Sequence, residues 1–232
     1  MKKVGFIGVY DKTNLILAIA KVLTIKSKRV LIIDTTIEQK FKYIVPTVHP
    51  TKTYITTWED IDVAVGFNSI EEINKYAGID QIESEYDVML VNIDTSEALD
   101  KMNTVENDMN FFVTAMDLFS IRKGAEIFSN LKQPIELKKI IFSREMNIEE
   151  EEYIDYLIRN YPINLEKSIF FPLMLEDRYV EADGQLIYKI DLKSISSIYK
   201  DSLAHLIGTI FNGEINELEA KRIIKILERE GT

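Results

Sequence analysis

The chain has 232 residues, a formal net charge of −10 and 46% hydrophobic residues, a composition that suits one α/β domain with a substantial core. The acidic balance disfavours nonspecific nucleic-acid binding as the main activity, because phosphate contacts need clustered lysine and arginine. The absence of cysteine excludes disulfides, thiol catalysis and cysteine-based zinc sites, and the two histidines, His49 and His205, are too few for a histidine-rich metal site.

Buried-strand patterns alternate with helical patterns along most of the chain. Continuous apolar runs, such as residues 30–33, are typical of strands that are covered on both faces of a parallel sheet. Helical spacing is expected in residues 12–23, from 69 onward, in 120–131 and in 149–160. Seven strands are expected at residues 4–8, 29–34, 61–67, 86–93, 110–115, 137–143 and 167–172. We therefore predict an α/β fold with a mostly parallel, twisted sheet of about seven strands and helices on both faces.

Two segments depart from this alternation. Residues 40–59 hold two of the five prolines and the only tryptophan, Trp58, and we expect a long surface excursion there. Residues 194–232 are expected to be the C-terminal helical part of a single domain that spans residues 1–232. The last helix mixes acidic and basic side chains, whereas membrane-binding amphipathic helices carry a basic polar face. We therefore expect it to dock onto its own domain or a partner, with peripheral membrane contact unexpected.

Location follows from two further features of the sequence. No run of about 18 apolar residues exists, so no transmembrane segment is expected. The basic start of the chain lacks the uninterrupted apolar region of a signal peptide. A cytoplasmic location is therefore predicted.

The turn after the first expected strand is the prime candidate for a binding site, since ligands of parallel sheets bind at the carboxyl ends of the strands. Residues 8–13 read Gly-Val-Tyr-Asp-Lys-Thr and open a helix. A P-loop requires Gly-x-x-x-x-Gly-Lys-Ser/Thr, with glycines that let backbone amides surround phosphate, a lysine for the terminal phosphates and a hydroxyl for magnesium. Lys12 and Thr13 fit the last two positions, but Phe6 and Asp11 occupy the glycine positions.

The order of these features resembles the MinD/ParA family of deviant P-loop ATPases, which belong to the SIMIBI class. Residues 4–35 match the family's first strand, loop, helix and second strand, which ends at Asp34. Residues 86–92 resemble its Walker B strand, with Asn92 in place of the magnesium-side aspartate. Residues 112–122 resemble its fifth strand and the start of the next helix. Residues 138–144 resemble the strand that carries the adenine-reading asparagine, where Ser143 or Arg144 stands instead, and Ile7 aligns with the family's signature lysine.

The resemblance implies a site for ATP and Mg²⁺ with degenerate motifs. By resemblance, Lys12 and Asp34 are the candidate catalytic residues, and Thr13 and Asn92 are the candidate metal-binding residues. An asparagine amide can still bind a metal-bound water but supplies less charge than aspartate. The candidate cofactor-binding residues are Gly8, Val9, Tyr10, Asp11, Lys12, Thr13 and Asn14.

Asp11 changes the chemistry expected of this turn. The start of a helix offers free amides to an anion, and a carboxylate at this place is expected to bond the amides near Thr13 and Asn14. It would then repel a phosphate by about 1 to 4 kcal/mol at about 4 Å. Lys12 is expected to pair with Asp11, Asp34 or Asp94.

Three functions are open on this evidence. The first is a MinD/ParA-like positioning or scaffold protein with weakened or lost ATPase activity. By resemblance, it would act through a homodimer and protein partners in partition, polar placement, or pilus, secretion or conjugation assembly. The second is an active ATPase that dimerises with ATP, for which Lys12→Ala would abolish turnover. The third is a receiver-like regulatory module, which a five-stranded sheet would favour. Abundant Ile, Lys, Asn and Glu indicate a bacterial, AT-rich genome.

Overall fold

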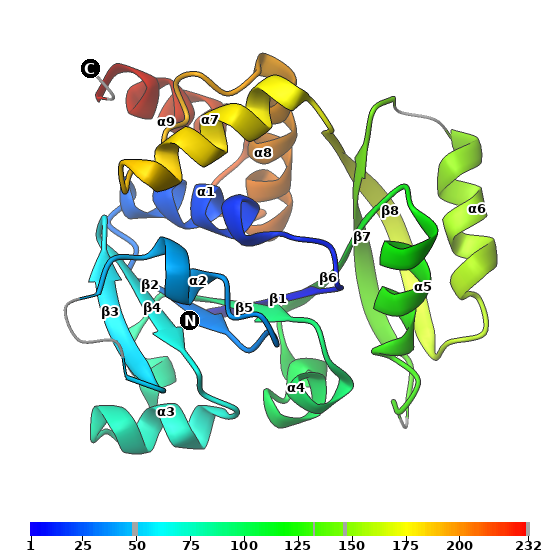
Figure 1. The fold of residues 1–232 in the computed structure, drawn as a ribbon, viewed down its shortest axis with the longest axis horizontal. Helices are drawn as coiled ribbons and strands as arrows, with labels where there is room; N and C mark the ends of the chain where they lie inside the picture. Colours follow the sequence, from blue (N-terminus) through cyan, green and yellow to red (C-terminus); the bar gives the residue numbers. More distant parts are fainter. Residues whose placement is uncertain (48–50, 132, 146–147, 231–232) are drawn as a thin grey trace.

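The computed structural model describes residues 1–47, 51–131, 133–145 and 148–230, and these residues form an eight-stranded sheet (Figure 1). The strand order is β3-β4-β2-β5-β1-β6-β7-β8, and every neighbouring pair is parallel except β3–β4. The strands are β1 (Lys2–Ile7), β2 (Val30–Asp34), β3 (Tyr54–Trp58), β4 (Ile61–Val65), β5 (Val88–Ile93), β6 (Met109–Ala115), β7 (Ile135–Ser143) and β8 (Ile163–Pro172). The predicted α/β fold with a mostly parallel sheet is confirmed, with one strand more than expected.

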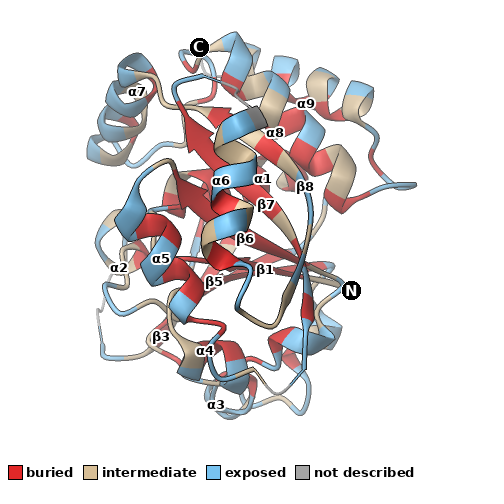
Figure 2. Ribbon diagram, turned by 90° about the vertical axis from the view of Figure 1, so that its right-hand side faces the viewer, coloured by how far each residue is buried: buried red, intermediate tan, exposed pale blue. Residues whose placement is uncertain are grey.

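Helices cover both faces of this sheet because its central strands are apolar on both sides. In β2, Val30 and Ile32 join the core beneath α1 (Thr13–Thr24), α8 (Ser197–Ile210) and α9 (Glu217–Glu230). Leu31 and Ile33 join the core on the opposite face, beneath the helices from α3 (Ile70–Ala77) to α6 (Ile148–Ile158). Figure 2 shows the buried strands between the two helical layers. The helices are α1 (Thr13–Thr24), α2 (Phe41–Ile44), α3 (Ile70–Ala77), α4 (Ser96–Lys101), α5 (Leu118–Glu126), α6 (Ile148–Ile158), α7 (Leu175–Leu186), α8 (Ser197–Ile210) and α9 (Glu217–Glu230), with 3₁₀ turns at Ile82–Glu85 and Thr104–Glu106.

The expected surface excursion at residues 40–59 is wrong in part, since this segment contains α2 and β3. A two-residue turn joins β3 to β4, and both of its residues, Glu59 and Asp60, have positive φ angles of 51° and 63°. Two positive φ angles are typical of the turns that close tight β-hairpins. Trp58 is only 9% exposed at the end of β3. His49 lies outside the described residues.

Helix α9 packs against α8 and α1, and it buries Ala220, Ile223, Ile224 and Leu227. Ion pairs from Lys26 to Glu219 and from Lys28 to Glu214 join the turn after α1 to α9 and to the turn that precedes α9. The helix therefore docks onto its own chain, one of the two arrangements expected.

None of the described helices is long and apolar enough to cross a bilayer. His205 is exposed on α8, and its Nδ1 lies 3.0 Å from Glu217 Oε2.

Helix α7 has no counterpart among the expected elements. It buries only Asp177 and Gly184, so its sequence lacks the apolar residues at helical spacing by which a helix is predicted. Its position is fixed by polar contacts instead: Asp177 accepts hydrogen bonds from the backbone N–H of Ser196 at 2.6 Å and from its hydroxyl at 2.8 Å. Figure 1 shows α7 lying across α1.

Candidate functional site

The turn between β1 and α1 lies at the carboxyl edge of the sheet, where β1 is flanked by β5 and β6. Gly8 opens the turn with a φ of 145°, and a Cβ on it would lie 2.1 Å from the carbonyl oxygen of Val113 in β6. Its N–H donates to the carbonyl of Ile93 in β5 at 3.0 Å. Glycine is therefore required here by the close approach of three strands, whether or not a ligand binds.

Asp11 closes the start of α1 with its own carboxylate. Its Oδ1 accepts hydrogen bonds from the N–H of Thr13 at 3.1 Å and from the Thr13 hydroxyl at 2.8 Å. The predicted bond to the Thr13 amide is thus observed, whereas Asn14 directs its side chain to α7. Its Oδ2 accepts from Lys40 at 3.0 Å, a contact that the sequence did not indicate. Burial acts to raise the pKa of Asp11, but the bonds from Thr13 and Lys40 outweigh it and hold the pKa below its usual value.

Lys12 is buried, with 3% exposure, and its Nζ donates to the carbonyl oxygen of Gly8 at 2.6 Å. The expected ion pair with Asp11, Asp34 or Asp94 is replaced by this bond within the turn. Burial lowers the pKa of Lys12 to about 8, although the fields of those three carboxylates act in the opposite direction. The Lys12 ammonium is therefore influenced by three carboxylates but forms an ion pair with none of them in the described residues.

Asp34 is the last residue of β2 and Asn92 is the next-to-last residue of β5, and the two lie side by side in the register of these strands. Both are buried, and Asn92 Nδ2 lies 3.4 Å from Asp34 Oδ1. Asp34 also accepts from the N–H and hydroxyl of Thr36 and from the N–H of Phe41. Burial raises its pKa despite these bonds. Asn92 Oδ1 is buried without a hydrogen-bond partner in the described part of the chain, and unpaired buried oxygens of this kind call for an explanation.

Two further positions suggested by the family pattern are occupied by structural contacts. Ile7, in the place of the signature lysine, is fully buried in the core beneath α3 to α6. Ser143, one of the two candidates for the place of the adenine-reading asparagine, has its Oγ 2.8 Å from the Glu145 carbonyl oxygen and 2.9 Å from Glu150 Oε2, which share its one proton. The side chains of Ile7 and Ser143 are therefore occupied in this arrangement, whereas Arg144, the other candidate, is exposed.

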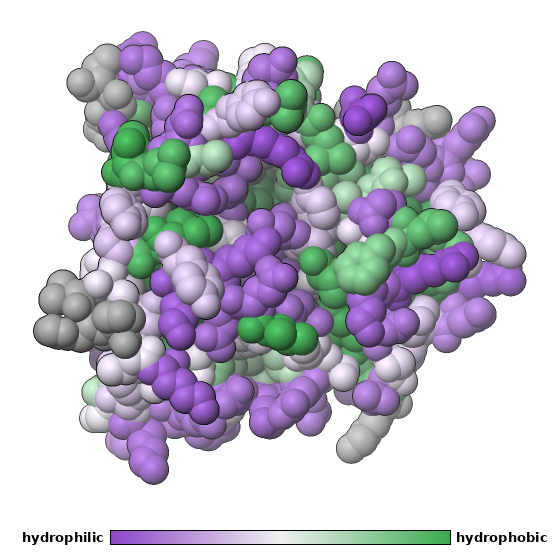
Figure 3. Space-filling view, in the orientation of Figure 1, coloured by the Kyte–Doolittle hydropathy of each residue, from purple (hydrophilic) through white to green (hydrophobic). Residues whose placement is uncertain are grey.

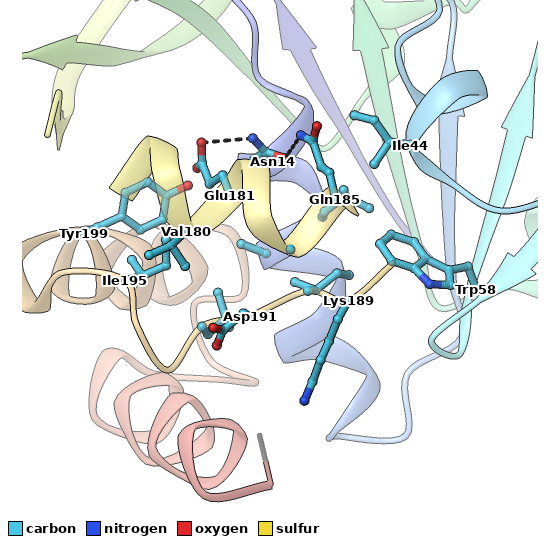
Figure 4. A pocket seen from close by; sticks show the side chains of 15 residues that line it. Asn14, Ile44, Trp58, Val180, Glu181, Gln185, Lys189, Asp191, Ile195 and Tyr199 are labelled. Carbon is cyan, nitrogen blue, oxygen red and sulfur yellow. Dashed lines mark hydrogen bonds between the residues drawn. The ribbon is translucent and has the colours of Figure 1, made fainter. Parts of the chain in front are cut away.

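A cavity of about 440 Å³ lies beside the turn, between α1, α7 and the ends of β7 and β8. Arg178 of α7 donates to the hydroxyl of Tyr10 at 2.8 Å. Asn14 of α1 donates to Glu181 at 2.9 Å and accepts from Gln185 at 3.0 Å (Figure 4). Sequence reasoning missed every residue of this wall that comes from α7, because the helix itself was not predicted.

Glu181 has the most displaced carboxyl pKa in this region. Burial raises it from 4.5 to about 7, and the neighbouring charges of Asp11 and Asp177 act in the same direction, against the Asn14 bond and the charge of Arg178. Between these two pH values the folded chain holds a proton that the unfolded chain has released. Rising pH therefore costs stability in this window.

We expect Glu181→Gln to remove this pH dependence, because glutamine does not ionise. The loss of unfolding free energy between pH 5 and pH 8 should shrink by up to about 3 kcal/mol relative to the wild type. Urea denaturation of both proteins at several pH values measures it. Parallel stability profiles for the two proteins would contradict the raised pKa.

Acidic and histidine side chains do not gather into a metal site elsewhere: within the described ranges, no group of three or more is placed to hold an ion. Thr13 and Asn92, the two candidate metal-binding residues, differ in availability. The Thr13 hydroxyl donates its proton to Asp11, which holds a carboxylate beside its oxygen, whereas Asn92 Oδ1 lacks a partner in the described part of the chain. The donor set therefore fits the magnesium of a P-loop site only in part.

Known proteins match this chain in fold but not in sequence. No protein-family model matches the sequence, and no curated protein matches it either. Solved structures do match. A chain of the MinC:MinD cell division protein complex of Aquifex aeolicus is 16% identical, with 90% of this chain and 96% of that chain covered and a TM-score of 0.57. A ParA family ATPase from Chlorobium tepidum TLS is 15% identical, with 97% of each chain covered and a TM-score of 0.55.

A putative plasmid partition protein from Borrelia burgdorferi B31, bound to AMPPNP, is 14% identical, with coverage of 92% and 99% and a TM-score of 0.51. The sheet, its helical layers and the turn after β1 define a P-loop NTPase-like α/β fold. Within that class, the chain has the fold of the MinD and ParA ATPases. At these identities the likeness concerns the fold alone.

Proposed function

We propose that this chain is a MinD/ParA-like positioning or scaffold protein of the bacterial cytoplasm whose ATPase activity is weakened or lost. The observation that carries the proposal is the carboxylate of Asp11, which bonds the Thr13 amide and hydroxyl at the start of α1. In a phosphate-binding loop these groups face an anionic ligand and its magnesium. Here a side chain supplies the anion, and its pKa keeps it charged at neutral pH.

Two other contacts support the same conclusion. The Lys12 ammonium bonds the Gly8 carbonyl and is buried, and the buried Ile7 leaves no cation to reach a second subunit. ATP and Mg²⁺ would bind here only if Asp11 moved away from Thr13. When bound, Mg²⁺ would supply charge neutralisation at the phosphates, a role for which Asn92 offers an uncharged oxygen.

Protein partners are the expected means of action. Large apolar side chains are exposed at the carboxyl edge of the sheet, after β2, β6 and β8: Ile37, Leu118, Phe119 and Leu175, with Phe119 70% exposed. Figure 3 shows that hydrophobic groups form separate patches on a largely hydrophilic face. Exposed apolar groups beside the site support a partner surface there, as a homodimer or with another protein. The names of similar structures point to cell division and plasmid partition as candidate processes.

The test is the affinity for ATP, measured by calorimetry with and without Mg²⁺. We expect no binding by the wild type at micromolar concentrations, and a gain of at least about fivefold in Asp11→Gly, because the variant removes a repulsion of about 1 to 4 kcal/mol. Asp100→Gly, at an exposed acid on α4, has the same charge change away from the turn and should gain nothing. Micromolar MgATP binding by the wild type would refute the proposal.

An active ATPase is the second candidate. It is favoured by Asn92 Oδ1, which has no partner among the described residues and could bind a metal-bound water. In that case Lys12→Ala abolishes ATP turnover and ATP-dependent dimerisation. In the proposal above, the same substitution changes neither. A five-stranded sheet would have favoured the receiver-like module, and the eight-stranded sheet of the described residues does not.

A further inference from the structure

The cavity between the turn and α7 has features of a ligand site that the phosphate-loop comparison does not explain. Its volume of about 440 Å³ lies in the range of small-molecule sites. Its wall combines the aromatic rings of Tyr10, Phe142 and Tyr199 with three acidic and two basic side chains. A smaller apolar recess of about 40 Å³ shares Asn14, Glu181, Gln185 and Tyr199 with it (Figure 4).

Most charged groups of this wall already have partners. Lys40 pairs with Asp11, Asp177 is bonded by Ser196, and Arg178 donates to Tyr10. Glu181 differs, because in the described part of the chain it has one hydrogen bond, from the neutral amide of Asn14, and no ion pair. The charge of Arg178 acts on this carboxyl, but no cation forms an ion pair with it in the described residues, so attraction for a positive group is left unused.

Tyr199 supplies a second, independent observation. The residue is 97% buried and lines both cavities. Its backbone N–H donates to Ser196 Oγ, and its ring packs against Phe171. Its hydroxyl has no hydrogen-bond partner among residues 1–47, 51–131, 133–145 and 148–230. Figure 4 shows this hydroxyl directed toward Glu181, whose charge acts on it. The hydroxyl is not among the fully buried unpaired atoms of the described residues, so it is open to the cavity and can bond a ligand that enters there.

We propose that this cavity binds an organic cation, an ammonium or guanidinium group on an apolar stem, with Glu181 as its anionic partner and Tyr199 as a hydrogen-bonding partner. Tyr10 and Phe142, whose ring centroids are 4.8 Å apart, add aromatic surface to the wall against which an apolar stem can pack. The inference rests on the proposed function in one respect: a nucleotide at the turn would compete for the same cavity.

Proton release should accompany binding, because a cation beside Glu181 favours its charged form. Burial holds the pKa of this carboxyl at about 7 in the free chain, under the combined influence of Asp11, Asp177 and Arg178. Tyr10 and Tyr199 keep their protons in this range, since burial raises the pKa of both. The affinity is therefore expected to rise between pH 6 and pH 8.

The experiment is a calorimetric titration of the full chain with agmatine, which carries a guanidinium and an ammonium group. We expect one site, with affinity reduced about tenfold or more in Glu181→Gln and in Tyr199→Phe. The matched control is Asp183→Asn, an exposed acid on the same helix with the same charge change, which should bind as the wild type does. Absence of binding at about 10 mM agmatine, or equal binding by Glu181→Gln, overturns the proposal.

A second arm distinguishes the sources of such a cation. A blocked Gly-Gly-Arg-Gly-Gly peptide and its citrulline twin are titrated beside agmatine. Tighter binding of the arginine peptide supports an arginine side chain from a partner protein, and tighter binding of agmatine supports a free polyamine. Because no nucleotide is present, failure here leaves the proposed loss of ATP binding intact. Micromolar MgATP binding together with agmatine binding would refute that loss and retain the cation site.

Discussion

Replacing Gly8 by alanine is expected to prevent the chain from holding its native structure at 37 °C. The new Cβ would lie 2.1 Å from the Val113 carbonyl oxygen, which belongs to the backbone of a central strand and has little room to move. The φ of 145° adds strain that non-glycine residues rarely tolerate, about 1 to 3 kcal/mol. Together these costs approach the whole stability of a typical domain, about 5 to 15 kcal/mol.

Gly78→Ala is the matched control for this variant. Gly78 ends α3 with a φ of 69°, yet a Cβ there meets nothing within 4 Å. Gly78→Ala therefore measures the loss of stability that comes from the positive φ angle alone, about 1 kcal/mol, without any steric overlap. Circular dichroism and urea denaturation compare the two variants. If Gly8→Ala lost no more stability than Gly78→Ala, the close contact between the turn and β6 would be disproved.

The second large effect is expected at Lys139, a buried lysine on β7 with 2% exposure. Its Nζ lies 2.6 Å from Asp155 and 2.9 Å from Glu151, both on α6, and Ser168 of β8 donates to the same Glu151. Lys139→Ala removes the cation and leaves two carboxylates and a void between sheet and helix. We expect a loss of about 3 kcal/mol in unfolding free energy.

The comparison of variants shows which part of this loss is electrostatic. Lys139→Met keeps most of the volume, and replacing a buried ion pair by an apolar group of similar size costs less than leaving one partner alone. Lys138→Ala, at the neighbouring lysine that pairs with Glu166 near the surface, should cost less than about 1 kcal/mol. Urea denaturation ranks the three proteins. Equal losses for Lys138→Ala and Lys139→Ala would argue against the buried network.

Most of the sheet could be predicted from the sequence because its strands are covered on both faces. A continuous apolar run such as residues 30–33 has few other stable arrangements. The segment with β3 was missed because its strand is short, threonine-rich and at the sheet edge, where polar residues are tolerated. Helix α7 was missed because its position depends on Asn14 and Ser196, residues distant in the chain.

The candidate site was predictable only where its contacts are local. The bond between Asp11 and the Thr13 amide spans two residues and follows from the chemistry of helix starts. The bond from Lys40 to Asp11 and the Lys12 bond to the Gly8 carbonyl depend on the path of the folded backbone, which no motif records. The roles of Lys12, Asp34 and Asn92 in nucleotide chemistry stay predictions, to be tested by the ATP titration.

The central place of β1 has a consequence during synthesis on the ribosome. Its two neighbours, β5 and β6, emerge only after β2, β3 and β4, and the helices α8 and α9 that cover α1 emerge later still. The apolar surfaces of β1 and α1 therefore stay exposed to water until these distant segments have been synthesised. Pairing between such distant segments slows folding and favours aggregation of incomplete chains. Newly made chains of this protein should accordingly depend on chaperones more than a protein of equal size with local contacts.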